Sequence, residues 1–218
     1  MLGGSEMNNG KQAFTRTAYR RNARMKTVKM VELAILMAIV AVLQITGTGL
    51  RLGGTSISLV LIPIALGAML VGPWAGALLG CEFGAIVYIM GFTGVDMFTF
   101  ILIQDHPIYT ALICFGKGIA AGLASGYVYM LLKNKSLMAA VITASAVAPI
   151  VNTGLFILGA LFMQSTIASN FLAEGQTVIY FLVIICAGLN FIFEFGLNLL
   201  VSPALTRVVE TVNRRIAR

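Results

Sequence analysis

Residues 137–163 read LMAAVITASAVAPIVNTGLFILGALFM and contain no charged residue. An α-helix of about 20 predominantly apolar residues crosses the hydrocarbon core of a bilayer, so this stretch is long enough for a membrane span. The whole chain has the same character, since 59% of its residues are hydrophobic, 11% are charged and its mean hydropathy is +0.94. The sequence therefore predicts an integral membrane protein without a separate soluble domain.

Five further apolar segments accompany this one along the chain. The second of the six is short and contains Pro63, and only Gly72 and Pro73 separate it from the third. The predicted spans are 30–46, 57–72, 74–91, 108–131, 137–163 and 178–206. The predicted fold is all-α: a polytopic membrane protein built as a compact bundle of six transmembrane helices.

The positive charges predict the orientation of this bundle. Seven of the fifteen Lys and Arg residues precede the first span, Lys133 and Lys135 lie between the fourth and fifth, and four follow the sixth. Because positive residues concentrate on the cytoplasmic side, we expect both termini in the cytoplasm of a prokaryotic cell. The exceptions are Arg51, in an outer loop, and Lys117, inside a span. The net charge of +7 then reflects topology and contact with anionic lipid, and we expect no nucleic acid partner.

The same pattern divides the chain into a basic cytoplasmic N-terminal tail (1–29), a membrane domain (30–206) and a basic cytoplasmic C-terminal tail (207–218). It leaves open whether the first ten or so residues are native. The outer connections, which are longer than the inner ones, are 47–56, 92–107 and 164–177. Long loops on one face of a bundle commonly cover a ligand, although these could merely connect the helices.

Small residues recur in two of the spans. The two sets are Gly72, Gly76, Gly80 and Gly84, and Gly118, Gly122 and Gly126. Such stripes allow close helix contact in lipid, so we expect them to pack within the bundle, with a role in motion or partner contact as the alternative. The three cysteines have no paired short spacing and are expected to fill the core.

Polar residues inside the spans are more informative, because lipid penalises charged side chains by about 2.5–3.5 kcal/mol on insertion scales. They are Glu82, Lys117, Asn152, Asn190, Glu194 and Asn198. A rise of about 1.5 Å per residue places the first four near mid-depth. Two interpretations remain open: Glu82 and Lys117 form a buried ion pair, or Lys117 and Asn152 face a ligand cavity. We expect Glu194 and Asn198, which lie closer to the cytoplasm, to contact a partner or the inner helix ends.

Motifs typical of membrane enzymes are absent from the sequence. HExxH, GxSxG, a Walker phosphate loop and paired aspartates at helical spacing do not occur, and the single histidine, His106, lies in an outer loop. We therefore expect a protein that is not an enzyme, with no cofactor and no metal. Any ATP hydrolysis would have to come from a partner.

Over residues 30–206 the chain resembles the substrate-binding S components of energy-coupling factor (ECF) vitamin transporters. AILMA, from Ala34 to Ala38 in the first span, is similar to their Ala-x-x-x-Ala contact motif. IPIALGAMLVGPWAGALLGCEFG, residues 62–84, is similar to the region that joins their second and third spans. Ala34 and Ala38 share one helix face, on which another helix can pack closely; packing within the chain is the alternative.

The resemblance implies an S component that binds one small water-soluble vitamin or precursor from outside. It further implies a transmembrane coupling protein and two ATPase subunits as partners, and release of the ligand by toppling of the S component in the membrane. The expected ligand-binding residues are Asn152, Lys117, Asn190, Phe98, Arg51 and Tyr109, and the expected partner-binding residues are Ala34, Ala38 and Ala41.

The identity of the ligand is the least determined part of this prediction. Trp74 lies near the cytoplasmic side, which disfavours a pocket of stacked tryptophans such as thiamine or biotin would suit. Lys117 suits a carboxylate, so the preference is for pantothenate and then for riboflavin. A stand-alone secondary transporter or channel and a membrane assembly protein are the alternatives.

Overall fold

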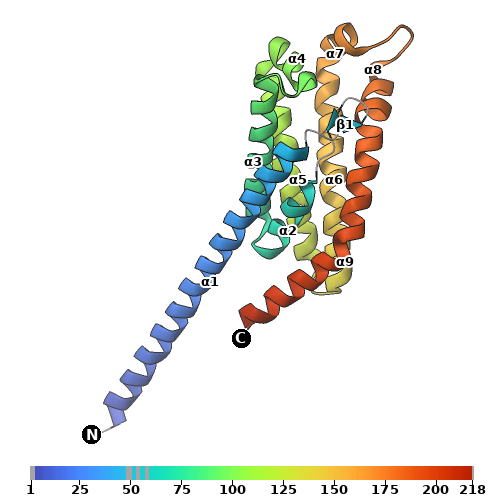
Figure 1. Ribbon diagram of the computed structural model, residues 1–218. Helices are drawn as coiled ribbons and strands as arrows, with labels where there is room; N and C mark the ends of the chain where they lie inside the picture. Colours follow the sequence, from blue (N-terminus) through green and yellow to red (C-terminus); the bar gives the residue numbers. More distant parts are fainter. Residues whose placement is uncertain (1–2, 48–50, 53–54, 57–58, 218) are drawn as a thin grey trace.

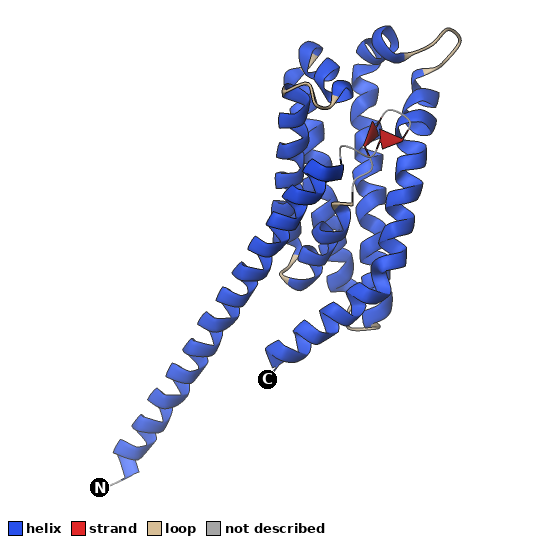
Figure 2. Ribbon diagram, in the orientation of Figure 1, coloured by secondary structure: helices blue, strands red, loops and turns tan. Residues whose placement is uncertain are grey.

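The computed structural model describes residues 3–47, 51–52, 55–56 and 59–217. Helices make up almost all of it (Figure 2). They are α1 (Gly3–Gly47), α2 (Leu61–Leu70), α3 (Pro73–Phe92), α4 (Met97–Asp105), α5 (Pro107–Leu132), α6 (Leu137–Ala160), the 3-10 helix η1 (Leu161–Met163), α7 (Gln164–Phe171), α8 (Val178–Tyr180), the π-helix η2 (Phe181–Gly188) and α9 (Leu189–Ala217). Two short strands, β1 (Arg51–Leu52) and β2 (Thr55–Ser56), pair antiparallel.

Five helical segments of the described chain are long and apolar enough to cross a bilayer. They are Met25–Gly47, Pro73–Phe92, Pro107–Leu132, Leu137–Phe171 and Val178–Val212. In place of the predicted second span, 57–72, the structure has the ten-residue helix α2. Such a helix is about 15 Å long, roughly half the thickness of the hydrocarbon core. The prediction of six full-length spans is therefore not confirmed.

The turn that follows α2 limits its length. Gly72 has a φ of +134° and its N–H donates to the Gly67 carbonyl at 3.4 Å. Only glycine adopts such a conformation readily. Pro73 then occupies the first position of α3, where its fixed φ is favourable and its missing N–H is not needed. The chain consequently reverses direction directly after α2.

Two of the spanning helices, α3 and α5, are in unusually close contact. A Cβ atom on Gly80 would overlap the backbone carbonyl of Gly118, and one on Gly122 would overlap the carbonyl of Gly76. The prediction that the glycine stripes pack within the bundle is thus confirmed for six of the seven glycines; at Gly72, in the turn before α3, a Cβ would meet nothing within 4 Å. Backbone-to-backbone contact of this kind replaces the hydrophobic effect as the packing force between helices in lipid.

The bundle has two distinct ends (Figure 1). Helices α4, α7 and α8 lie at one end, and both chain termini lie toward the other, with the N-terminal part of α1 extending away from the bundle (Figure 1). Termini on one side agree with the charge-based topology, in which the cytoplasmic assignment of that side stays a prediction. Three clusters of buried apolar side chains fill the interior, one of them at the end formed by α4 and α7.

Candidate ligand-binding site

A cavity of about 90 Å³ lies inside the bundle, and we call it the central cavity. Its wall is built from α1, α3, α4, α5, α6, η2 and α9. The polar residues that line it are Gln44, Asp96, Thr99, Lys117, Asn152, Thr153, Asn190 and Glu194. Chemistry suited to a small polar molecule is thus collected from helices that are far apart in the sequence.

Lys117 projects from α5 into this cavity between two phenylalanine rings. Its Nζ atom lies 5.4 Å from the centroid of the Phe83 ring, on α3, and 5.3 Å from that of the Phe156 ring, on α6. Both distances allow a cation–π attraction. Among the described residues the ammonium makes no hydrogen bond and no ion pair. A charged donor therefore faces the cavity without an acceptor.

The alternative interpretation of Lys117 as the ion-pair partner of Glu82 does not hold in the structure. Glu82 does not line the central cavity, and its buried Oε2 atom has no hydrogen-bond partner among the described residues. Phe83, the next residue along α3, faces the cavity instead, because successive residues of a helix point about 100° apart. The two charges lie at similar depth but on different sides of their helices.

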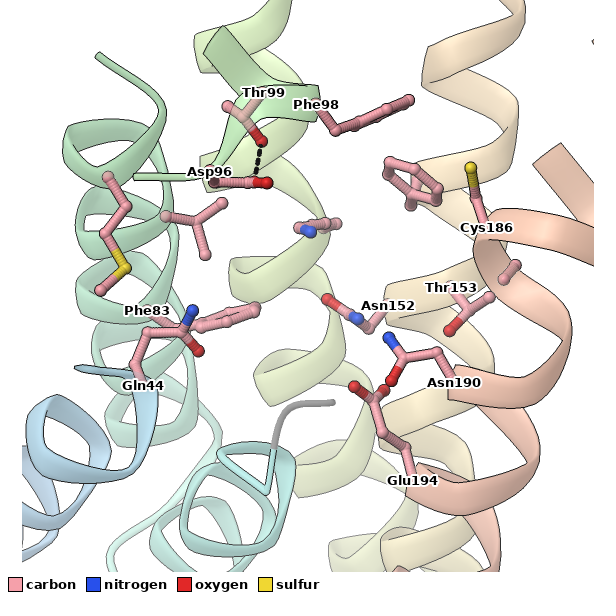
Figure 3. A pocket seen from close by; sticks show the side chains of 15 residues that line it. Gln44, Phe83, Asp96, Phe98, Thr99, Asn152, Thr153, Cys186, Asn190 and Glu194 are labelled. Atoms are coloured by element: carbon pink, nitrogen blue, oxygen red, sulfur yellow. Dashed lines mark hydrogen bonds between the residues drawn. The ribbon is translucent and has the colours of Figure 1, made fainter. Parts of the chain in front are cut away.

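Two side-chain amides, from Asn152 and Asn190, line the central cavity together with Lys117. Asn152 on α6 is 7% exposed, and the Oδ1 atoms of both Asn152 and Asn190 are buried without a hydrogen-bond partner among the described residues. Figure 3 shows Asn190 and Glu194 extending from α9 toward Asn152. Because a buried amide oxygen without a donor is costly, these positions are suited to a ligand that supplies one.

Glu194 lies one helical turn after Asn190 and is 3% exposed. It lines the central cavity, and the expectation that it contacts a partner or the inner helix ends stays a prediction. Asn198, one turn further, does not line the cavity; it is 1% exposed and its Nδ2 donates to the Glu194 carbonyl at 2.8 Å. Both side chains are thus buried in the interior of the bundle.

Asp96 and Thr99 contribute polar atoms from the beginning of α4. Thr99 Oγ1 donates to Asp96 Oδ2 at 2.5 Å, as the dashed line in Figure 3 marks. Asp96 occupies the position that precedes α4, and its backbone carbonyl accepts a hydrogen bond from Phe100. The carboxylate is thereby held at the edge of the cavity with one oxygen already engaged.

Phe98 anchors an aromatic cluster at the same end of the cavity. Its ring centroid lies 5.9 Å from that of Phe156, 5.1 Å from Phe171 and 6.5 Å from Phe181. The rings come from four helical segments and are tilted against Phe98, an arrangement that favours tight apolar packing. This cluster gives the cavity an apolar wall beside its polar one.

Four of the six predicted ligand-binding residues line the central cavity: Asn152, Lys117, Asn190 and Phe98. Tyr109 does not, because it is 57% exposed and its ring meets the edge of His106. The side chain of Arg51 lies outside the described residues. Gln44 was missed by the sequence reasoning, although an amide near the end of an apolar span is the same kind of signal that identified Asn152.

The predicted partner-binding residues lie on α1, away from the central cavity. Ala34 and Ala38 are exposed and Ala41 is half-buried, whereas Leu36 and Val40 on the opposite side of α1 pack into the core. Packing within the chain therefore does not use the face that carries Ala34 and Ala38. That face is open to lipid or to a partner.

Comparison with known families identifies the group to which this protein is related. The family model described as "ECF transporter, substrate-specific component" matches residues 28–206. The chain belongs to this family. Its members are multi-pass membrane subunits that bind a substrate and work with an ECF transporter module, whose ATPase activity resides in separate subunits. A comparison of this S component with curated proteins found no match.

Proposed function

We propose that this S component captures a small water-soluble vitamin, with pantothenate, which carries a carboxylate, as the first candidate and the neutral riboflavin as the second. The ligand enters from the outer side of a prokaryotic cell membrane and occupies the central cavity. A transmembrane coupling subunit and two ATPase subunits then power its uptake into the cytoplasm, where both termini of the chain lie.

The Lys117 ammonium carries this proposal. It is a charged group inside a membrane bundle, turned toward a cavity and held between two rings that provide no hydrogen-bond acceptor. Charged residues at such depth face a cavity or a partner and usually belong to a substrate pathway. A ligand carboxylate would complete the interaction that Phe83 and Phe156 only partly supply.

The polar side chains that α6 and α9 contribute to the cavity support pantothenate. This vitamin has a carboxylate at one end, a central amide and two hydroxyl groups at the other end. The amides of Asn152 and Asn190 can pair with such groups, and the Glu194 carboxylate can accept hydrogen bonds from hydroxyls. Riboflavin is neutral and presents a flat three-ring system, for which Phe98 would be the natural contact but Lys117 would have no carboxylate to bind.

The test begins with mass spectrometry of small molecules released from the purified protein, followed by calorimetric titration with pantothenate and riboflavin. A hydrogen bond to a charged group contributes about 1.5–3 kcal/mol. Lys117→Met should therefore lower the affinity for pantothenate about 10-fold to 100-fold or more. Lys135→Met, which removes the same charge from the exposed turn between α5 and α6, is the control.

The two results that bear on the proposal are easily separated. An affinity of Lys117→Met equal to that of the wild type would exclude a carboxylate at this position. A loss of thermal stability with unchanged affinity would assign Lys117 to the fold. A stand-alone transporter predicts uptake into liposomes without partners, and family membership favours the S component over it and over a membrane assembly protein.

A further inference from the structure

Glu82 is a carboxylate at the middle of a membrane-spanning helix that the central cavity does not use. It lies halfway along the 20 residues of α3, about 15 Å from either end, well inside the hydrocarbon core. Its residue is only partly buried, and its Oε2 atom is covered by protein but has no hydrogen-bond partner among the described residues. A group of this kind requires a partner.

The position of Glu82 on α3 shows in which direction that partner lies. Gly76, Gly80 and Gly84 face α5, and Phe83 faces the core. Glu82 follows Leu78 by one helical turn and precedes Ile89 by about two, and these two residues are 47% and 60% exposed. Glu82 therefore lies on the side of α3 that faces away from α5, where the protein covers one of its carboxylate oxygens.

Among the described residues no cation pairs with this carboxylate. Lys117 is the only basic residue within the six apolar segments, and it points into the central cavity. Lipid headgroups lie too far away, since Glu82 is at mid-depth. A symmetric dimer through this face would place one Glu82 near another and add repulsion without a cation. A basic side chain of a different membrane protein would supply the complementary charge at this depth.

We propose that Glu82 is the polar anchor of the surface on which the transmembrane coupling subunit docks, and that it pairs there with a Lys or Arg side chain from the middle of a partner helix. This inference rests on the proposed function. Helix α1, which carries the exposed alanine face, packs directly against α3. Alanines permit close approach of a partner helix, and Glu82 supplies the one charged contact that fixes its depth and position.

Glu82→Leu tests this directly, with Thr143→Leu as the matched control, a polar-to-leucine change on an exposed position of α6. Each variant is reconstituted in nanodiscs with the ECF module from the same genome, and the S component recovered with the module is measured. Glu82→Leu should reduce recovery at least tenfold, and Thr143→Leu should not. Glu82→Gln, which keeps the shape but removes the charge, should also lose most of the association.

The thermal midpoint of the isolated protein gives a second readout, because a structural role of Glu82 would lower the midpoint when the residue is replaced. Removing a carboxylate that has no partner among the described residues should leave the midpoint of Glu82→Leu unchanged or raise it. A lowered thermal midpoint would mean that Glu82 stabilises the fold of the S component, and it would overturn the inference. Normal recovery of Glu82→Leu with the module would also overturn it. Normal recovery of Glu82→Gln would exclude a basic partner group. If the wild type itself fails to associate, the proposed function fails and the inference with it.

Discussion

Replacement of Asn152 by leucine separates ligand binding from folding more sharply than any other single change in the central cavity. The Asn152 side chain is 7% exposed and its Oδ1 atom has no hydrogen-bond partner among the described residues, so the fold gains little from the amide. A ligand hydrogen bond contributes about 0.5–1.5 kcal/mol. Loss of two such bonds of about 0.7 kcal/mol or more each should therefore raise the dissociation constant about tenfold or more, because 1.4 kcal/mol corresponds to a factor of ten.

Calorimetric titration of the purified protein measures this change, and a thermal shift assay measures stability on the same sample. We expect the thermal midpoint of Asn152→Leu to stay within a few degrees of the wild type. Asn198→Leu is the matched control, since Asn198 is a buried amide outside the cavity whose Nδ2 donates to a backbone carbonyl. It should lose stability and keep its affinity. Unchanged affinity in a folded Asn152→Leu protein would refute a role for this amide in the pocket.

Three other predictions concern docking, packing and topology. Ala34→Trp or Ala38→Trp should leave binding by the isolated protein intact and abolish co-purification with the coupling module; normal assembly of the double variant would refute the assignment of this face. Gly80→Ala should destabilise the protein by about 1–3 kcal/mol through overpacking, whereas Gly116→Ala, which meets open space, should be neutral or stabilising by denaturant titration. Lys135→Cys should react with impermeant thiol reagents only from the cytoplasmic side, and labelling from outside intact cells would contradict the predicted topology.

Most of the architecture could be predicted because lipid imposes a simple requirement on sequence. Uninterrupted apolar segments of sufficient length identified every long helix, and the glycine repeat identified the α3–α5 contact. The predicted second span failed for a local reason. Gly67 to Pro73 builds a tight reversal after only ten helical residues, and an apolar segment does not reveal whether its helix spans the membrane or stops inside it.

The candidate site was predicted only in part, because counting residues along a span gives depth but not direction. Lys117, Asn152 and Asn190 were identified by the cost of polar groups in lipid and do line the cavity. Glu82 does not line the cavity, whereas Glu194, which was expected to contact a partner or the inner helix ends, does. In the last span the π-helix η2 also changes the angle between its residues and those of α9, which α-helical periodicity does not anticipate.

The arrangement of helices suggests how docking outside the bundle could reach the ligand. α3 and α5 are joined through their backbones at the glycine contact, so Phe83 and Lys117 on these helices keep a fixed relation to each other. α1 differs, because it carries the exposed Ala38 on one side and places Gln44, 5% exposed, in the cavity wall on the other. A partner that shifts α1 therefore moves Gln44 but does not separate Lys117 from the Phe83 ring on α3. We expect docking to loosen the α1 side of the cavity first, while the carboxylate end of the ligand stays held until the rest of its contacts are lost.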